Sequence, residues 1–148
     1  MSSTITTIAS SPTTVPADSS TAVLTLANVL YEKRGAIAYV TLNRPKVLNA
    51  LNTPTWKDLR AAFEDARADA AVRGVILTGA GEKAFIAGAD IGELAHASAI
   101  DAERSSRVGQ EVLDLVENLA KPVIAAINGF ALGGDADGAR HCRLAATA

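Results

Sequence analysis

With 148 residues, of which 49% are hydrophobic and 20% charged, the chain has the length and composition of one folded domain with a buried core. Its 14 basic and 16 acidic side chains leave a net charge of −2 and form no long basic run, which argues against nucleic acid as a partner. Apolar stretches such as 122–127 are far shorter than the roughly 20 residues that span a bilayer, so no transmembrane helix is expected.

The single cysteine and the N-terminal stretch bear on location. Cys142 excludes an internal disulfide and fits a reducing compartment, so we expect a cytoplasmic protein in which Cys142 is a small packing residue. The Ser/Thr-rich start of the chain matches neither a secretory signal nor a transit peptide. We interpret residues 1–27 as a disordered leader and 28–148 as the folded part. His96 and His141 lack metal-ligand spacing, and no metal site is expected.

The first predicted elements are a strand and a helix. Residues 36–42 are typical of a strand, which the following Asn-Arg-Pro ends because proline cannot donate to a ladder. Thr53 and Pro54 are typical of an N-cap and a first-turn proline, and they predict a helix to about residue 69. Four large or apolar side chains at helical spacing predict its buried face, namely Trp56, Leu59, Phe63 and Ala66.

The second half of the chain continues this alternation. Residues 75–77 predict a buried strand that leaves the sheet through a glycine turn, and 102–119 predict a long helix that Lys121-Pro122 ends. Residues 123–127 then form the next buried strand. The apolar face of the long helix is expected to comprise Val108, Val112, Leu115, Val116 and Leu119. Strands alternating with helices in this way indicate an α/β fold.

Two segments rich in glycine and alanine carry the candidate chemistry. They are Lys-Ala-Phe-Ile-Ala-Gly-Ala-Asp-Ile-Gly-Glu-Leu at 83–94 and Lys-Pro-Val-Ile-Ala-Ala-Ile-Asn-Gly-Phe-Ala-Leu-Gly-Gly at 121–134. Each ends in a turn whose small residues let backbone amides approach a substrate, and two facing turns can direct two N–H groups at one developing oxyanion. Asp90 is expected to cap a short helix while Glu93 reaches back to it, a variant capping box. Ala89 would then lie at a helix N-terminus, where free N–H groups favour an anion.

These segments, together with Leu-Asn-Arg-Pro-Lys-Val-Leu-Asn-Ala-Leu at 42–51 and Val-Arg-Gly-Val-Ile-Leu-Thr-Gly-Ala-Gly at 72–81, resemble the crotonase superfamily of enoyl-CoA hydratases and isomerases. The four segments occur in the family's order and cover roughly residues 29–134. The resemblance implies an α/β fold of the crotonase type, a spiral of ββα repeats that is truncated here, with 28–148 as an incomplete N-terminal domain. It also implies a homotrimer or hexamer for the intact family.

The resemblance further implies the site residues. The amides of Ala89 and Gly134 would form the oxyanion hole for an acyl-CoA thioester, and coenzyme A would belong to the substrate, so no separate cofactor is expected. The implied substrate-binding residues are Ala87, Ala89, Asp90, Ile91, Gly92 and Gly134, with Asn49 and Ala50 beside the coenzyme A channel. The segment 48–51 is equally well described as a loop that leads into a helix.

The acid/base machinery differs from the family pattern. Family hydratases carry a glutamate after the glycine turn, in Gly-Gly-Gly-Cys-Glu-Leu-Ala, where this chain has Gly-Asp-Ala-Asp-Gly-Ala at 134–139. Counted without gaps Asp137 takes the catalytic position, although its side chain is one methylene shorter; the alternative is a solvated surface acid. The family's second glutamate would follow residue 148.

The expected function is therefore that of an enoyl-CoA hydratase (a lyase) or isomerase that stabilises an enolate, as in fatty-acid β-oxidation. The alternative is a non-catalytic acyl-CoA-binding or interaction module that lacks the acid/base pair. A dinucleotide-binding domain is disfavoured, because the glycine turn at 79–81 is followed by a second turn and not by a long helix.

Overall fold

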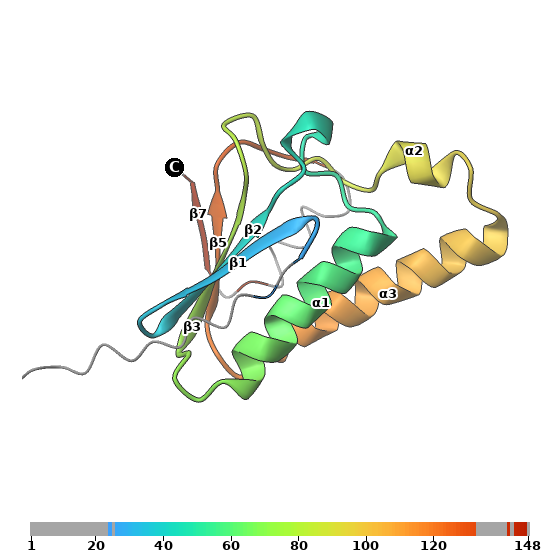
Figure 1. Ribbon diagram of the computed structural model, residues 1–148. Helices are drawn as coiled ribbons and strands as arrows, with labels where there is room; N and C mark the ends of the chain where they lie inside the picture. Colours follow the sequence, from blue (N-terminus) through green and yellow to red (C-terminus); the bar gives the residue numbers. More distant parts are fainter. Residues whose placement is uncertain (1–23, 25, 133–141, 143, 148) are drawn as a thin grey trace, which may run out of the picture.

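A five-stranded sheet forms the framework of the protein, seen at the left of Figure 1. The computed structural model describes residues 24, 26–132, 142 and 144–147, without the side chains of 144–147. In spatial order the strands are β1 (Val29–Arg34), β2 (Ile37–Leu42), β3 (Gly74–Gly79), β5 (Val123–Ile127) and β7 (Leu144–Thr147). β1 and β2 form an antiparallel pair, and every later pairing is parallel. The predicted strands at 36–42, 75–77 and 123–127 are confirmed.

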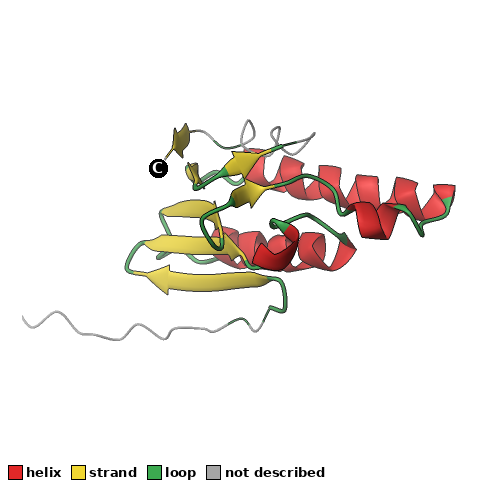
Figure 2. Ribbon diagram, turned by 90° about the horizontal axis from the view of Figure 1, so that it is seen from above, coloured by secondary structure: helices red, strands yellow, loops and turns green. Residues whose placement is uncertain are grey.

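Two long helices, α1 (Thr53–Ala68) and α3 (Ala99–Glu117), connect parallel strands and cover one face of the sheet (Figures 1 and 2). α1 joins β2 to β3, and α3 lies between β3 and β5 in the chain. Parallel neighbours need such crossovers, because the chain must return to the same end of the sheet before the next strand begins. The α/β layering predicted from the sequence is thus confirmed.

A second, smaller layer lies beyond the ends of the large-sheet strands. β4 (Ala84–Ile86) follows β3, β6 (Phe130–Ala131) follows β5, and these two short strands pair in parallel. A parallel bridge between Leu51 and Ala89 belongs to the same region. A strand of the large sheet, then a short strand, then a helix is the expected ββα repeat. Two short helices lie in the connections: η1 (Pro45–Val47) between β2 and α1, and α2 (Ile91–Leu94) between β4 and α3.

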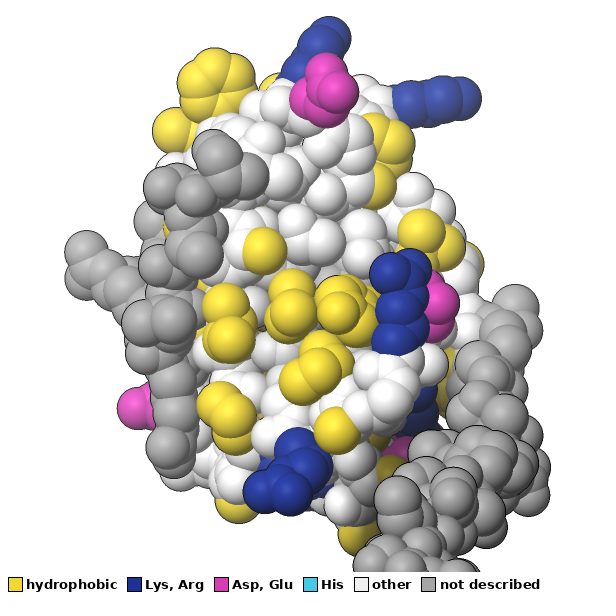
Figure 3. Space-filling view, turned by 90° about the vertical axis from the view of Figure 1, so that its left-hand side faces the viewer, with side chains coloured by type: hydrophobic (Ala, Val, Ile, Leu, Met, Phe, Trp, Pro, Cys, Tyr) yellow, Lys and Arg dark blue, Asp and Glu magenta, His cyan; other side chains and the backbone are white. Residues whose placement is uncertain are grey.

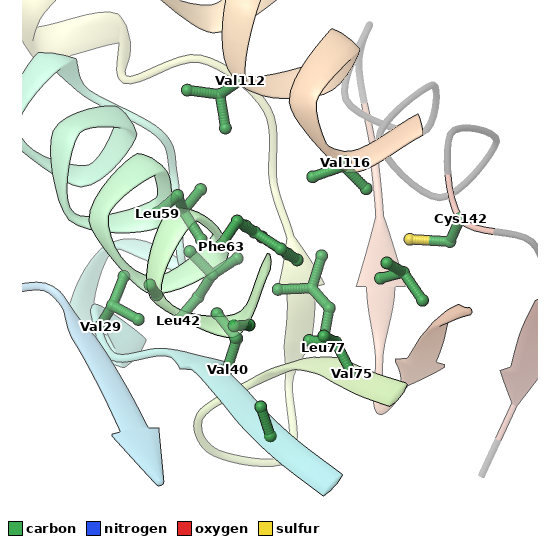
Figure 4. Close-up of a cluster of buried hydrophobic side chains, with 14 of the residues drawn as sticks. Val29, Val40, Leu42, Leu59, Phe63, Val75, Leu77, Val112, Val116 and Cys142 are labelled. Carbon is green, nitrogen blue, oxygen red and sulfur yellow. The ribbon is translucent and has the colours of Figure 1, made fainter. Parts of the chain in front are cut away.

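The core lies between the sheet and the two helices, as the close-up in Figure 4 shows. Phe63 and Leu59 of α1 and Val112 and Val116 of α3 are buried against the strands, which confirms the apolar faces predicted for both helices. Cys142 is buried in the same cluster, so its predicted packing role is confirmed. Burial raises the pKa of the Cys142 thiol to about 11.

The helix ends differ from the sequence prediction. The N-cap of α1 is Asn52 and not Thr53: its side-chain oxygen accepts from the Thr55 amide at 3.0 Å and from the Thr55 hydroxyl at 2.6 Å. Both Asn and Thr are good caps, and the extended backbone of Asn52 decides between them. α3 begins at Ala99, because Ser98 caps it, and ends at Glu117, before the predicted Lys121-Pro122 stop.

The sheet face opposite the helices carries a band of apolar side chains, visible in Figure 3. Tyr39, Ile76 and Ile124 lie in one row across β2, β3 and β5 and are each partly buried. Leu30 on β1 is 53% exposed.

Of the helices within the described part of the chain, none has the length and apolar character needed to cross a membrane.

Lys121 fixes the C-terminal end of α1. Its ammonium donates to the carbonyl oxygens of Ala66 and Asp69, each at 2.6 Å. These carbonyls are at the end of a helix, where they lack partners within the helix and where the negative end of the dipole favours a cation. A second cation, Lys33, lies 2.7 Å from the Asp69 carboxylate. The bond from Lys121 therefore joins α1 to the start of β5.

We expect the substitution Lys121→Met to lower the free energy of unfolding by about 2 kcal/mol, because it removes two charge-assisted hydrogen bonds while keeping most of the aliphatic length. Urea denaturation followed by circular dichroism measures this. Lys57→Met, at an exposed position of α1, is the matched control and should change stability by less than about 0.5 kcal/mol. Equal effects of the two substitutions would contradict the role of Lys121.

Candidate functional site

The loop after β2 lies against the turn between β3 and β4, and the buried Asn49 holds the two together. Asn49 is 1% exposed. Its side-chain nitrogen donates to the carbonyls of Ala80 at 3.0 Å and Ala84 at 2.8 Å, and its oxygen accepts from the Arg44 amide at 3.0 Å. Leu48 and Asn49 both have left-handed backbones, with φ of 55° and 56°. Such strain persists only where the surroundings enforce it, and it clusters at functional sites.

Asn128 holds the same β3–β4 turn from the β5 side. Its side-chain oxygen accepts from the Gly79 amide at 3.1 Å, and its nitrogen donates to the Gly81 carbonyl at 2.6 Å. Gly79 is required by space, because a Cβ there would lie 2.5 Å from the Phe85 carbonyl oxygen. The turn is consequently fixed from two directions, and β4 leaves it in a defined orientation.

In the segment that follows β4, Ala89 lies among backbone groups that are hydrogen bonded to the loop after β2. The amide of Ala87 donates to Leu48 at 3.1 Å, that of Asp90 donates to Leu51 at 2.9 Å, and that of Leu51 donates to Gly88 at 2.8 Å. Ala89 lies between these bonded groups and is exposed. Its amide donates to no residue in the described part of the chain. An N–H that is rigidly held, exposed and unpaired can donate to a ligand oxygen.

Asp90 caps the short helix α2 and pairs with Arg44. One carboxylate oxygen accepts from the Gly92 amide at 3.0 Å, and the other lies 2.9 Å from the Arg44 guanidinium. Both side chains are less than one-fifth exposed. The hydrogen bond from Arg44 lowers the pKa of the Asp90 carboxyl below its usual range, with further help from the ion-pair attraction and the backbone donors.

The predicted capping box is only half correct. Asp90 is the N-cap, as predicted, but Glu93 does not reach back to the Asp90 amide. That amide is already bonded to Leu51, so the Glu93 carboxylate accepts from the Thr53 amide at 2.9 Å instead. Glu93 thereby ties α2 to the first turn of α1, and its negative charge lies at a helix N-terminus, where it is favourable.

A surface groove runs beside the β3–β4 turn. It is lined by η1 and the β3–β4 turn, with Lys46 and Lys83 as its cations and Glu82 as its anion. Leu48 lines the groove and also receives the Ala87 amide, so the groove adjoins the segment that presents Ala89. After Ala89 in the sequence, Ile91 is 79% exposed and Leu94 is 48% exposed. The groove and the segment beside it therefore offer two cations, an amide with no partner among the described residues, and exposed apolar side chains.

The structure brings most of the residues predicted for the site together. Ala87, Ala89, Asp90, Ile91 and Gly92 form one continuous turn, and the loop of Asn49 and Ala50 is bonded to it through Leu48 and Leu51. The Asn49 side chain is fully used inside the protein, so contact of this segment with coenzyme A stays a prediction. Gly134 and Asp137 lie outside the described residues.

Sequence reasoning missed Arg44. No local signal pairs it with Asp90, because 46 positions separate them in the chain.

His96 is exposed, and its ring nitrogen Nδ1 lies 2.9 Å from the Gly92 carbonyl. Within the described residues no group of His, Cys, Asp and Glu side chains is arranged to hold a metal ion.

Comparison with known proteins identifies the family. Residues 32–146 match the model of the enoyl-CoA hydratase/isomerase family, and the chain belongs to this family. It is 49% identical over 119 residues to a short-chain-enoyl-CoA hydratase of Clostridium acetobutylicum, which covers 80% of this chain and 46% of that protein. It is 44% identical over 122 residues to a crotonyl-CoA hydratase of Syntrophomonas wolfei, with 81% and 47% covered.

Solved structures agree with the sequence relatives. An enoyl-CoA hydratase/carnithine racemase of Magnetospirillum magneticum matches with a TM-score of 0.78 and 43% identity over 83% of this chain and 47% of the other. An enoyl-CoA hydratase of Bacillus anthracis matches with a TM-score of 0.79 and 34% identity, with 82% and 47% covered. The predicted crotonase-type fold is confirmed, and the chain spans about half the length of the relatives it matches.

Replacing Asn49 by alanine tests the link between the loop and the turn. We expect Asn49→Ala to lower the free energy of unfolding by about 3 kcal/mol, because it leaves buried backbone groups without partners and places alanine at a left-handed φ. Urea denaturation measures the loss. Asn118→Ala, which removes an exposed asparagine at the end of α3, should cost less than about 1 kcal/mol. A loss at Asn49 no larger than this control would refute the assigned role.

The Arg44–Asp90 pair predicts a pH-dependent stability. Because folding lowers the pKa of Asp90 below its usual 3.8, the pair stabilises the protein above that value and loses its effect as the pH falls through the lower, folded-state pKa. Asp90→Asn should cost about 1–2 kcal/mol near pH 7, and the gap to the unmodified protein should close in acid. Denaturation curves at pH 7, 5 and 3 measure it, and a gap that is the same at every pH would contradict the pairing.

Proposed function

We propose that this chain provides the acyl-thioester site of an enoyl-CoA hydratase or isomerase, in which backbone amides stabilise an enolate. The observation that supports the proposal is the amide of Ala89, an exposed residue: this amide has no partner among the described residues, and hydrogen bonds hold the turn on both sides of it. When a proton leaves the α-carbon of a thioester, or water adds to the β-carbon of its unsaturated form, negative charge moves to the carbonyl oxygen. A fixed donor at that oxygen lowers the barrier, by about 3 kcal/mol for a single group.

We propose the amide of Gly134, which follows β6 in the chain, as the second donor. β4 and β6 are parallel, Ile86 pairs with Ala131, and the Leu132 amide donates to Ile86 at 3.0 Å. The part of the chain that leads to Gly134 therefore starts beside the part that leads to Ala89. Asp137 is proposed as the acid/base group that follows this turn.

The groove beside the site suits the remaining part of the substrate. We propose that the phosphates of coenzyme A lie near Lys46 and Lys83, so that remote binding energy orients the reacting carbon. Coenzyme A is then part of the substrate, and the reaction needs no separate cofactor. Assembly as a homotrimer or hexamer and a cytoplasmic location, both expected from the sequence, belong to the same proposal.

Crotonyl-CoA tests the proposal directly. The chain should consume the conjugated ultraviolet absorbance of crotonyl-CoA as water adds across its double bond, and Asp137→Ala should abolish the reaction. Ala89→Pro, which removes the amide proton, should lower kcat by about 10²–10³-fold. Bound crotonyl-CoA should also show a lower thioester C=O stretching frequency in difference Raman spectra, and this shift should shrink in Ala89→Pro.

Affinity for crotonyl-CoA without any turnover would contradict the enzymatic proposal and support the acyl-CoA-binding alternative. Absence of both affinity and turnover would contradict the thioester site itself. Circular dichroism of Ala89→Pro separates the loss of the donor from a loss of folding.

A further inference from the structure

We propose that Arg44 is a positioning and charge-compensating residue of the oxyanion site, acting through Asp90. The inference rests on the proposed function, since it assumes that the Ala89 amide receives a thioester oxygen. It concerns a residue of the loop after β2, which does not itself belong to the turn that carries that amide.

The contacts of Arg44 join both sides of the site. Its guanidinium donates to the Ala50 carbonyl at 2.5 Å and to the Asp90 carboxylate at 2.9 Å. Ala50 precedes Leu51, whose backbone is bonded on both sides of Ala89, and Asp90 follows Ala89 directly. The planar guanidinium of Arg44 thus holds together the two segments of the chain that flank the Ala89 amide. Arginine suits this role because its rigid fork offers several donors in fixed directions.

Charge gives Arg44 a second effect. The Asp90 carboxylate is needed as the cap of α2, but it places a negative charge one residue from the amide that receives an oxyanion. Unpaired, this carboxylate would oppose the charge that develops on the substrate, and partial burial would strengthen the repulsion. The ion pair with Arg44 cancels most of that field. The nearby Glu93 is directed to the Thr53 amide of another helix.

Acetoacetyl-CoA tests this inference, because it can occupy an oxyanion site as a neutral keto form or as an enolate. On enolisation the C2–H bond breaks, its electron pair moves into the C=C–O⁻ system, and the proton goes to the buffer. The enolate absorbs more strongly in the ultraviolet than the keto form. Spectrophotometric titration of the bound ligand therefore gives its enolisation pKa in each variant of the full chain.

The expected order of the enolisation pKa separates charge compensation from a purely structural role. Arg44→Gln leaves Asp90 unpaired and should raise the pKa by about one unit, a tenfold loss of enolate preference. Asp90→Asn leaves the cation alone and should lower it. The double variant Arg44→Gln/Asp90→Asn should return close to the unmodified protein. Arg34→Gln, on the exposed Arg34–Glu32 pair of β1, should change nothing.

The alternative results are distinct. If the unmodified chain binds acetoacetyl-CoA but the pKa rises equally in both single variants and in the double variant, Arg44 acts by shape alone and charge compensation is refuted. If Arg44→Gln leaves the pKa unchanged, the whole inference is overturned while the thioester site stands. If the unmodified chain does not bind acetoacetyl-CoA, the proposed function fails, and the inference fails with it.

Discussion

The site depends on one buried side chain, that of Asn49. Its amide satisfies the Ala80 and Ala84 carbonyls and the Arg44 amide at once, in a place with almost no access to water. Buried polar groups that are fully satisfied fix a single arrangement of the chain, because any displacement leaves several of them without partners. The strained backbone at Leu48 and Asn49 is retained for this reason. The loop and the turn consequently behave as one rigid unit.

That unit determines which backbone groups remain free. Once the loop is fixed, Leu51 accepts from Asp90 and donates to Gly88, and Leu48 accepts from Ala87. These bonds use the Ala87 amide, the Gly88 carbonyl and the Asp90 amide, and the N–H of Ala89 has no partner among the described residues. A donor that is already held in place needs no reorganisation when charge develops on a ligand, which is the main advantage of a backbone oxyanion hole. The Ala89 amide remains available as a donor because the backbone groups around it are already bonded to the loop.

The sequence predicted the regular parts of the fold because they repeat a pattern. The apolar spacing of Leu59 and Phe63 in α1 and of Val112 and Val116 in α3 sufficed to place both helices and their buried faces. It did not predict β4 and β6, since strands of three and two residues carry no detectable period. The start of α1 was misplaced by one residue, because Asn52 and Thr53 are both good caps. The position of Ala89 at the start of α2 was predicted because glycine, alanine and a capping aspartate are local signals.

Contacts between distant parts of the chain were not predictable in the same way. Glu93 matched the local capping pattern, yet tertiary structure gave the Asp90 amide to Leu51 and directed Glu93 to Thr53. Arg44 likewise has no local partner, and only the packing of the loop against the turn brings it to Asp90. A helix cap beside an oxyanion donor combines two opposite electrostatic needs, a negative charge for the helix and none for the ligand. A cation supplied from another loop meets both needs, because it neutralises the carboxylate without removing its hydrogen bond to the helix.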